Sequence, residues 1–314
     1  MYKYSEFENI ADSPKWDEGV LLGKNPSFYQ STAFAEGKKL CGYKTKFALV
    51  EDEKGNVLLR AVVIIHSFGI YIHRGPICYE NSIGALNYFF VELLERYDLN
   101  IFFSSNILDL EGGRRLSELC VQNGAYHTMM LKIENSFEKQ MTMMNQNRRR
   151  IIRKVLRTDS EFVFEQGKHN LDLFLQCMIS NNNSLLDNKK LIPEIIAMSK
   201  QKFVELYVCK FRGQVVSGIM GFVFGDVFES RYNTNSKKYM HLNAGTFLDC
   251  NILAKLIEDG VRYYDFAGYD VNAKEGEKEA NINYYKRSYG GSVVKFNNYT
   301  LRKNKKNYMI EMLK

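Results

Sequence analysis

The order of predicted strands and helices occurs twice along the chain, and this repetition limits the folds it can adopt. Residues 45–133 and 203–300 both predict two strands joined by a glycine turn, a third strand, an amphipathic helix, a strand, a short helix and a last strand. The turn glycines, Gly55 and Gly213, lie about 160 positions apart. One copy alone would leave a sheet face uncovered. The pattern predicts two similar α/β modules, with chance similarity of two mixed halves as the alternative.

The repeat divides the chain near residue 145. We expect a first domain at 1–145, with 300–314 packing back on it, and a second domain at 146–299. A helix over 137–157 would join the two modules, and 169–199 would add helices to the second. No proline-rich or glycine-rich linker separates the halves, so we expect them to pack closely.

Composition narrows the class of protein. Of the 314 residues 45% are hydrophobic and 13% aromatic, which is enough for real cores. Polar residues and glycine interrupt the longest apolar run, 61–73, and the polar first residues lack a signal-peptide core. The six cysteines form no Cys-x-x-Cys pair, and the five histidines show no ligand spacing. We therefore expect a cytoplasmic protein with no membrane span and no metal site.

Positive charge is concentrated in one segment. The net charge is +7, and "NRRRIIRKVLR" at 147–157 places six cations beside an apolar stripe along about three helical turns. A phosphate-contacting surface and an ordinary solvated helix face both fit this pattern.

The second copy ends in two aromatic motifs, "YYDFAGYD" at 263–270 and "YYKRSYGG" at 284–291. In the first copy, "YIHRGPI" places Arg74 before a Gly-Pro turn, where its guanidinium could bind a phosphate or carboxylate, or simply cap the turn. Asn243 and the next two residues open a helix whose amides form an anion site, or the asparagine serves as a plain N-cap.

Together these motifs resemble the Fem family of peptidoglycan interpeptide-bridge aminoacyltransferases, which have two tandem acetyltransferase-like (GNAT) modules. The family's Asp-Phe-Gly-Gly and Phe-Lys-x-x-Phe-Gly-Gly signatures align with 265–268 and 285–291. "YIHRGP" resembles Tyr-x-Pro-Arg-Gly-Pro, and "QSTAFAEGK" at 30–38 is similar to Gln-x-x-x-Trp-Ala-x-x-Lys. His73 and Phe34 stand where proline and tryptophan are usual. The resemblance covers residues 25–300.

The resemblance implies transfer of an aminoacyl group from aminoacyl-tRNA to an amine of a peptidoglycan precursor, with no tightly bound cofactor. Its implied partners are an anionic or lipid-linked precursor and tRNA, without DNA and with peripheral contact at the inner membrane face. It places the acceptor side in the first module and the donor side in the second. The acceptor-binding candidates are Lys38, Tyr71, Arg74 and Gly75, and the donor-binding candidates are Arg231, Asn243, Gly245, Tyr285 and Arg287.

Amide formation from an activated donor requires mainly positioning and charge stabilisation, without a covalent enzyme intermediate. Lys286 is the first catalytic candidate, as a cation facing the developing oxyanion or a donor phosphate, and an exposed helix lysine is the alternative. Asp265 and Asp270 are candidate proton acceptors, although turn acids look the same and the substrate could pass the proton itself. We expect the reacting groups to lie between Asp265 and Lys286, where strands of the second module splay.

Two other functions stay open. "LNAGTFL" at 242–248 also resembles the Ser-Pro-Gly-x-x-Leu of a related class. This supports an acyl-CoA-dependent N-acyltransferase that acts on an amino sugar or sugar nucleotide in cell-surface polysaccharide synthesis. The third function is a catalytically idle module that holds RNA or an acidic polymer through its basic helix.

Overall fold

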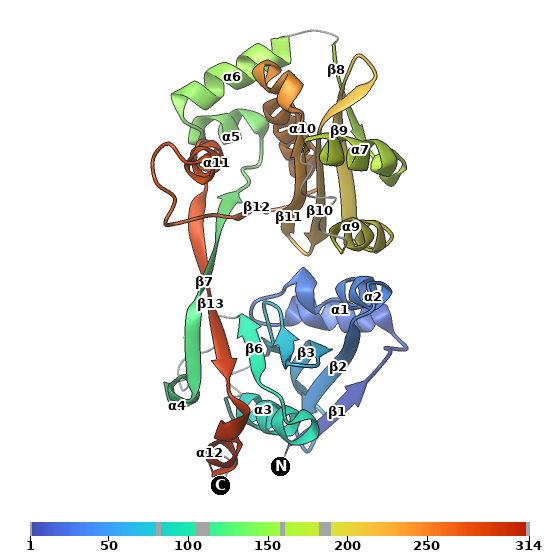
Figure 1. Ribbon diagram of the computed structural model, residues 1–314, viewed down its shortest axis with the longest axis vertical. Helices are drawn as coiled ribbons and strands as arrows, with labels where there is room; N and C mark the ends of the chain where they lie inside the picture. Colours follow the sequence, from blue (N-terminus) through green and yellow to red (C-terminus); the bar gives the residue numbers. More distant parts are fainter. Residues whose placement is uncertain (1, 80–82, 105–113, 158–160, 182–189, 312–314) are drawn as a thin grey trace. The chain divides into compact units, whose positions relative to one another are not determined.

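The structure is a computed structural model that describes residues 2–79, 83–104, 114–157, 161–181 and 190–311 (Figure 1). Contacts between residues divide the chain into two compact units. The first consists of Met1–Tyr126 and Lys295–Lys314, and the second of His127–Val294. The division falls at Tyr126, earlier than the expected residue 145, because 127–145 packs with the second unit.

The first unit is a mixed sheet with strand order β1-β2-β3-β4-β6-β13, and β5 pairs with β3. Only β4 and β6 are parallel among these pairs of described strands. Its elements are β1 (Lys3–Phe7), α1 (Ser13–Leu22), α2 (Thr32–Leu40), β2 (Lys44–Glu51), β3 (Val57–His66), β4 (Gly69–Ile72), β5 (Ile77–Cys78), α3 (Ile83–Tyr97), β6 (Ile101–Ser104), α4 (Arg114–Leu119), β13 (Ser292–Leu301) and α12 (Lys306–Glu311).

Helix α3 forms most of the helical side of the first core. Its apolar residues recur every three to four positions, so one face is continuous and packs on the sheet. Leu86, Phe89, Phe90 and Leu93 are buried in a single cluster with residues of β3, β4 and β6. Helix α12 packs against α3 and adds Met309 to this cluster.

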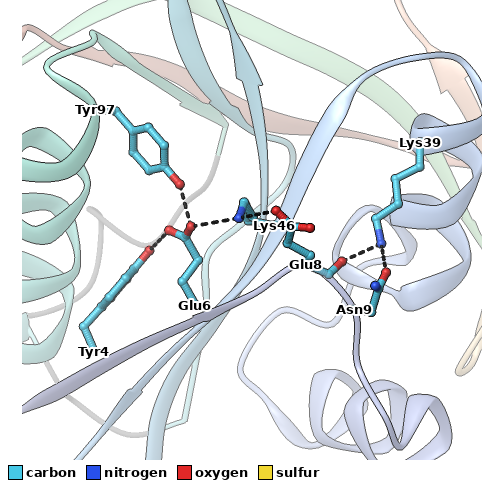
Figure 2. Close-up of polar contacts among 7 residues, drawn as sticks. All are labelled: Tyr4, Glu6, Glu8, Asn9, Lys39, Lys46 and Tyr97. Carbon is cyan, nitrogen blue, oxygen red and sulfur yellow. Dashed lines mark hydrogen bonds and ion pairs between the residues drawn. The ribbon is translucent and has the colours of Figure 1, made fainter.

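Polar contacts attach strand β1 to this unit. The Glu6 carboxylate accepts hydrogen bonds from the hydroxyls of Tyr4 (2.8 Å) and Tyr97 (2.5 Å), and lies 3.6 Å from the Lys46 ammonium. Burial is the largest cause of the raised pKa of Tyr97. Figure 2 shows these contacts and their continuation to α2 among Tyr4, Glu6, Glu8, Asn9, Lys39, Lys46 and Tyr97.

The second unit has strand order β7-β12-β11-β10-β9-β8, in which β11 and β12 are parallel and the other described pairs antiparallel. Its elements are β7 (Cys120–Lys132), α5 (Phe137–Met143), α6 (Gln146–Arg157), β8 (Phe162–Gln166), α7 (Leu171–Asn181), α9 (Leu191–Ser199), β9 (Val204–Phe211), β10 (Gln214–Phe224), β11 (Val227–Asn235), α10 (Ala244–Glu258), β12 (Tyr263–Gly268) and α11 (Lys278–Arg287).

Helices cover both faces of the second sheet, as alternation along β10 shows. A Cβ placed on Gly218 would lie 2.5 Å from the Phe174 ring of α7. The next residue, Ile219, belongs instead to the cluster that contains Leu248 and Leu253 of α10. Because successive strand residues point to opposite faces, α7 and α10 lie on opposite sides.

The predicted α/β repeat is confirmed, and both turn glycines, Gly55 and Gly213, adopt φ of +79°. One feature differs from the prediction. The last strand of each copy pairs within the other unit, since β13 pairs with β6 and β7 pairs with β12. Strand alternation predicts where a strand lies along the chain, and its partner depends on long-range packing.

The helix predicted over 137–157 is two helices, α5 and α6. The break lies at Met144 and Asn145. The Asn145 side chain accepts a hydrogen bond from the Arg148 amide (2.8 Å), and its carbonyl accepts one from the Arg149 amide (3.1 Å). Asn145 therefore caps a new helix, which is a common role of asparagine.

Candidate functional site

Lys286 lies on α11, half-buried in the second unit. Its ammonium donates hydrogen bonds to the carbonyls of Ala267 (3.1 Å) and Gly268 (2.5 Å) at the end of β12. Burial lowers the pKa of Lys286 to about 8, and the nearby charges of Asp265 and Asp249 oppose this shift. The position therefore holds a cation that loses its proton close to neutral pH.

Strand β12 leaves its partners at this point. Its parallel pairing with β11 extends from Tyr263 to Asp265, opposite Val227 to Glu229. On the other side, one extra residue of β12 forms a bulge against β7 between Asp265 and Gly268. Within the bulge Ala267 has a φ of 54°, which is uncommon for a residue with a side chain. The backbone thereby turns two successive carbonyls toward Lys286.

The two predicted acids occupy different environments. Asp265 is fully buried, and its Oδ1 accepts hydrogen bonds from the Ala267 amide (2.8 Å) and from the Thr128 hydroxyl. Asp270 is exposed, and its carboxylate accepts a hydrogen bond from the Asn272 amide (2.9 Å). The structure thus places the Ala267 peptide between Asp265 and Lys286, while Asp270 caps the following turn.

Tyr285 belongs to a buried network that the sequence analysis did not identify. The Asp249 carboxylate of α10 accepts hydrogen bonds from Tyr285 (2.5 Å), Tyr264 (2.8 Å) and Tyr289 (3.3 Å). Burial raises the pKa of Asp249, and the tyrosine hydroxyls and the charge of Arg148 oppose that shift. The sequence feature that could have identified this network is Asp249 itself, an acid on the apolar face of a predicted helix.

Arg148 completes this network from α6. It is buried, donates to Ser288 Oγ (2.7 Å) and Thr246 Oγ1 (2.6 Å), and its guanidinium lies over the Tyr285 ring at 4.2 Å. One cation of the basic segment is therefore structural, because it joins α6, α10 and α11.

The predicted donor residues lie in two settings. Asn243 has a φ of 59° and does not cap α10 with its side chain, which donates instead to the His241 carbonyl (3.3 Å). Gly245 lies in the first turn of α10, where a Cβ would be 2.6 Å from Asn235 Oδ1. Arg231 and Arg287 are both exposed. Asn243 is therefore the N-cap residue of α10 by position, but its side chain makes no capping hydrogen bond, and the Asn235 side chain packs closely against Gly245.

The predicted acceptor residues lie in the first unit. Arg74 has a φ of 44°, its amide donates to Ser104 Oγ (2.9 Å), and its guanidinium lies over the Phe296 ring at 4.6 Å. At Gly75 a Cβ would lie 2.5 Å from the Gln30 side chain, which binds the His73 carbonyl (2.6 Å). The turn therefore requires glycine for packing.

Lys38 and Tyr71 are half-buried among aromatic rings of the same unit. The Lys38 ammonium lies 5.5 Å from the Phe34 ring and 5.3 Å from the Tyr43 ring. Tyr71 stacks on Phe102 at 4.8 Å.

The outer face of α6 presents a basic surface. Ile152 and Val155 are buried, while the opposite side is exposed and hollowed. We define the basic face as the exposed cations that line this hollow: Arg150, Arg153, Lys154 and Arg157.

The described residues contain no group of three or more acidic, histidine or cysteine side chains that could hold a metal ion. No helix in the described ranges is long and apolar enough to cross a membrane.

Comparison with known proteins identifies the fold. Residues 144–287 match the family described as "Acetyltransferase (GNAT) domain". The crystal structure of FemX gives a TM-score of 0.79 at 14% identity, covering 98% of this chain and 99% of that chain. L-PGS from Bacillus licheniformis gives 0.61 at 13% identity, covering 96% of each chain. A tandem GNAT protein from the clavulanic acid biosynthesis pathway gives 0.57 at 7% identity, covering 96% and 99%. No curated protein sequence matches the chain.

The predicted tandem GNAT fold of the Fem type is therefore confirmed. The acetyltransferase domain match confirms the prediction of an acyl- or aminoacyltransferase.

Proposed function

We propose that this chain, with its tandem GNAT fold, forms an amide by transferring an aminoacyl group from aminoacyl-tRNA to an amine of a cell-wall precursor. The observation that carries the proposal is Lys286, a half-buried cation held at the end of β12 where β11 and β12 stop pairing. The likeness to FemX, which covers the whole fold, supports the same choice.

Lys286 would stabilise the charge that develops on the donor carbonyl. A lysine ammonium has three N–H donors, and the carbonyls of Ala267 and Gly268 use two of them. The third is available for the oxygen of the tetrahedral intermediate, an interaction typically worth about 3–4 kcal/mol. The acceptor nitrogen bonds to the carbonyl carbon, the carbon–oxygen bond to the tRNA ribose breaks, and the amine proton passes to the departing oxygen.

The second unit also offers anion-binding groups for the donor. The first turn of α10, with Gly245, combines helix-end amides with a positive dipole. The basic face of α6 suits a string of phosphates, because arginine forks bind phosphate oxygens in pairs. We assign the tRNA backbone to the basic face.

The acceptor is assigned to the first unit. Lys38 and Arg74 supply positive charge for an anionic, phosphate-bearing precursor, and Tyr71 supplies an aromatic surface. This assignment rests on the family resemblance and on the half-buried positions of the three side chains. The proposed tRNA donor would in turn require a cytoplasmic protein, because charged tRNA is available there.

The second candidate is transfer of an acyl group from coenzyme A to an amino sugar or sugar nucleotide. The match of 144–287 to an acetyltransferase domain favours it, as does the first turn of α10, which would suit a pyrophosphate.

The deciding experiment supplies the purified protein with radiolabelled charged tRNA and radiolabelled acetyl-CoA in parallel. Lipid-linked and nucleotide-linked amine acceptors are included in both arms. Label that enters an acceptor only from tRNA supports the first proposal, and label only from acetyl-CoA supports the second. Tight binding of RNA without transfer from either donor would contradict both and favour a module that only binds.

A further inference from the structure

We propose that Thr128 is a positioning residue that acts through Asp265 to hold the Ala267 peptide, so that the Ala267 and Gly268 carbonyls face Lys286. The inference rests on the proposed catalytic role of Lys286 and assigns Asp265 to positioning. Thr128 lies on β7, opposite Gly268 in the strand register.

The Ala267 backbone needs such a restraint. Its φ of 54° is a left-handed conformation that costs about 1–2 kcal/mol for a residue with a Cβ atom. Glycine would adopt it freely, but alanine keeps it only when the surroundings determine it. The bulge supplies the extra residue, and hydrogen bonds at both ends of the peptide supply the restraint.

Asp265 supplies the bond on the amide side. It accepts from the Ala267 N–H at 2.8 Å, while Lys286 donates to the Ala267 carbonyl at 3.1 Å. Since Asp265 is 0% exposed, no solvent or substrate reaches it directly. A buried carboxylate is stable when hydrogen bonds satisfy it, so its two donors favour positioning over proton transfer.

Thr128 orients the carboxylate. Its hydroxyl donates to the same Oδ1 atom, and its side chain is also 0% exposed. Three hydrogen bonds therefore run in series from β7 to α11, through Thr128, Asp265, the Ala267 peptide and Lys286. Removing the first bond would let the carboxylate rotate and the left-handed peptide relax.

The test uses Thr128→Val in the full chain, because valine keeps the shape and removes only the hydroxyl. We expect kcat for transfer to fall about 10- to 100-fold with KM changed less than about 3-fold, because misplacement near the chemistry affects mainly the transition state. Thr128→Ser restores the hydroxyl and should restore kcat. Thr234→Val, which removes a buried hydroxyl 3.6 Å from Cys177, is the matched control and should leave kcat unchanged.

A second readout does not depend on activity. The pH dependence of Lys286 labelling by an amine reagent, followed by peptide mass spectrometry, reports its environment. In Thr128→Val the freed lysine reaches water, so its titration should move to higher pH; the two charged groups that act on it, Asp265 and Asp249, are both still present in this variant. In the double variant Thr128→Val/Ala267→Gly, the Lys286 titration should return toward that of the Ala267→Gly single variant, because glycine removes the strain.

Unchanged kcat and unchanged Lys286 titration in Thr128→Val would overturn the proposal. If the chain transfers no group from any donor, the titration alone decides the positioning role. Failure of the proposed function is thereby distinguished from failure of this inference. If Thr128→Val does not fold, Thr128→Ala, which also removes the hydroxyl, takes its place: a Lys286 titration moved to higher pH supports the restraint, and an unchanged one contradicts it.

Discussion

At the scale of single residues, Lys286 combines features that serve function better than stability. Its charge is half-buried against two carbonyls, and burial outweighs the attraction of nearby acids. A group whose pKa is lowered by folding disfavours the folded state in its charged form. A charge kept at a cost in stability is typical of sites selected for function, which supports the role proposed for Lys286.

Replacing Lys286 by methionine should separate activity from stability. We expect transfer to fall about 100- to 1000-fold, the usual loss when one oxyanion donor is removed. The thermal unfolding midpoint should stay equal or rise, because the cost of burying the charge disappears. Transfer assays and calorimetry on the same preparation measure both. A large fall in the midpoint would show that Lys286 serves mainly structure.

The pKa of Lys286 also predicts a pH profile. As pH rises through about 8 the ammonium loses its proton, so kcat should fall on the alkaline side. Lys286→Arg keeps its charge and should lose this alkaline limb, even if its overall rate is lower.

The same shift predicts the pH dependence of stability. The folded pKa of about 8 lies below the unfolded value of about 10.4, so the unfolded chain binds more protons between these values. For this group the free energy of unfolding therefore rises with pH in that window. Urea titrations of the parent chain and of Lys286→Met at about pH 7.5 and about pH 10 should show this rise only in the parent.

At the scale of elements, helix α6 has two faces with different tasks. On the inner face Ile152 and Val155 are buried, and Arg148 joins the Asp249 network through its hydrogen bonds. The outer face carries the four cations of the basic face. Like charges three and four positions apart destabilise a helix slightly, so a polyanionic partner would account for their arrangement.

Arg148→Met should destabilise the protein by about 3–5 kcal/mol, because it leaves Asp249 buried without its nearby cation. Urea unfolding measures the loss. Arg150→Met changes an exposed cation on the same helix and should alter the free energy of unfolding by less than about 0.5 kcal/mol. Equal effects of the two variants would contradict the assignment of the inner face.

Charge reversal on the basic face tests its partner. The triple variant Arg150→Glu/Arg153→Glu/Arg157→Glu should raise KM for charged tRNA at least about 10-fold and weaken the salt dependence of binding. The unfolding midpoint should change little, because these side chains are exposed. The control reverses three exposed lysines elsewhere, at Lys54, Lys200 and Lys238, and so makes the same change in net charge. If the control weakens tRNA binding equally, only net charge matters.

At the scale of the whole molecule, the exchange of last strands makes each unit dependent on both halves of the sequence. Strand β6 pairs with β13, and β12 pairs with β7. A fragment of residues 1–145 therefore lacks β13 and exposes an unpaired edge of β6. We expect this fragment to aggregate or remain largely unfolded, measured by circular dichroism and sedimentation. A monomeric fragment with cooperative unfolding would show that the exchanged strand is dispensable.

Most elements of the repeat could be predicted from the sequence, because alternation and helical periodicity are local. Gly55 and Gly213 marked equivalent turns, and the aromatic motif at 284–291 directed attention to Lys286. Thr128, Arg148 and Asp249 could not be assigned in this way. Each contacts residues far along the chain, and a lone polar residue in an apolar segment does not reveal its partner.

The sequence by itself thus determined the repeated α/β order and the turns, since these depend on neighbours a few positions apart, and its resemblance to the Fem motifs pointed to Lys286. Only the tertiary structure decided which strand pairs with β6, which strand pairs with β12, and what lies between Asp265 and Lys286. The buried Asp265 carboxylate requires hydrogen-bond donors, and the Ala267 amide and the Thr128 hydroxyl provide them. Burial makes such partners necessary, and folding selects which residues they are.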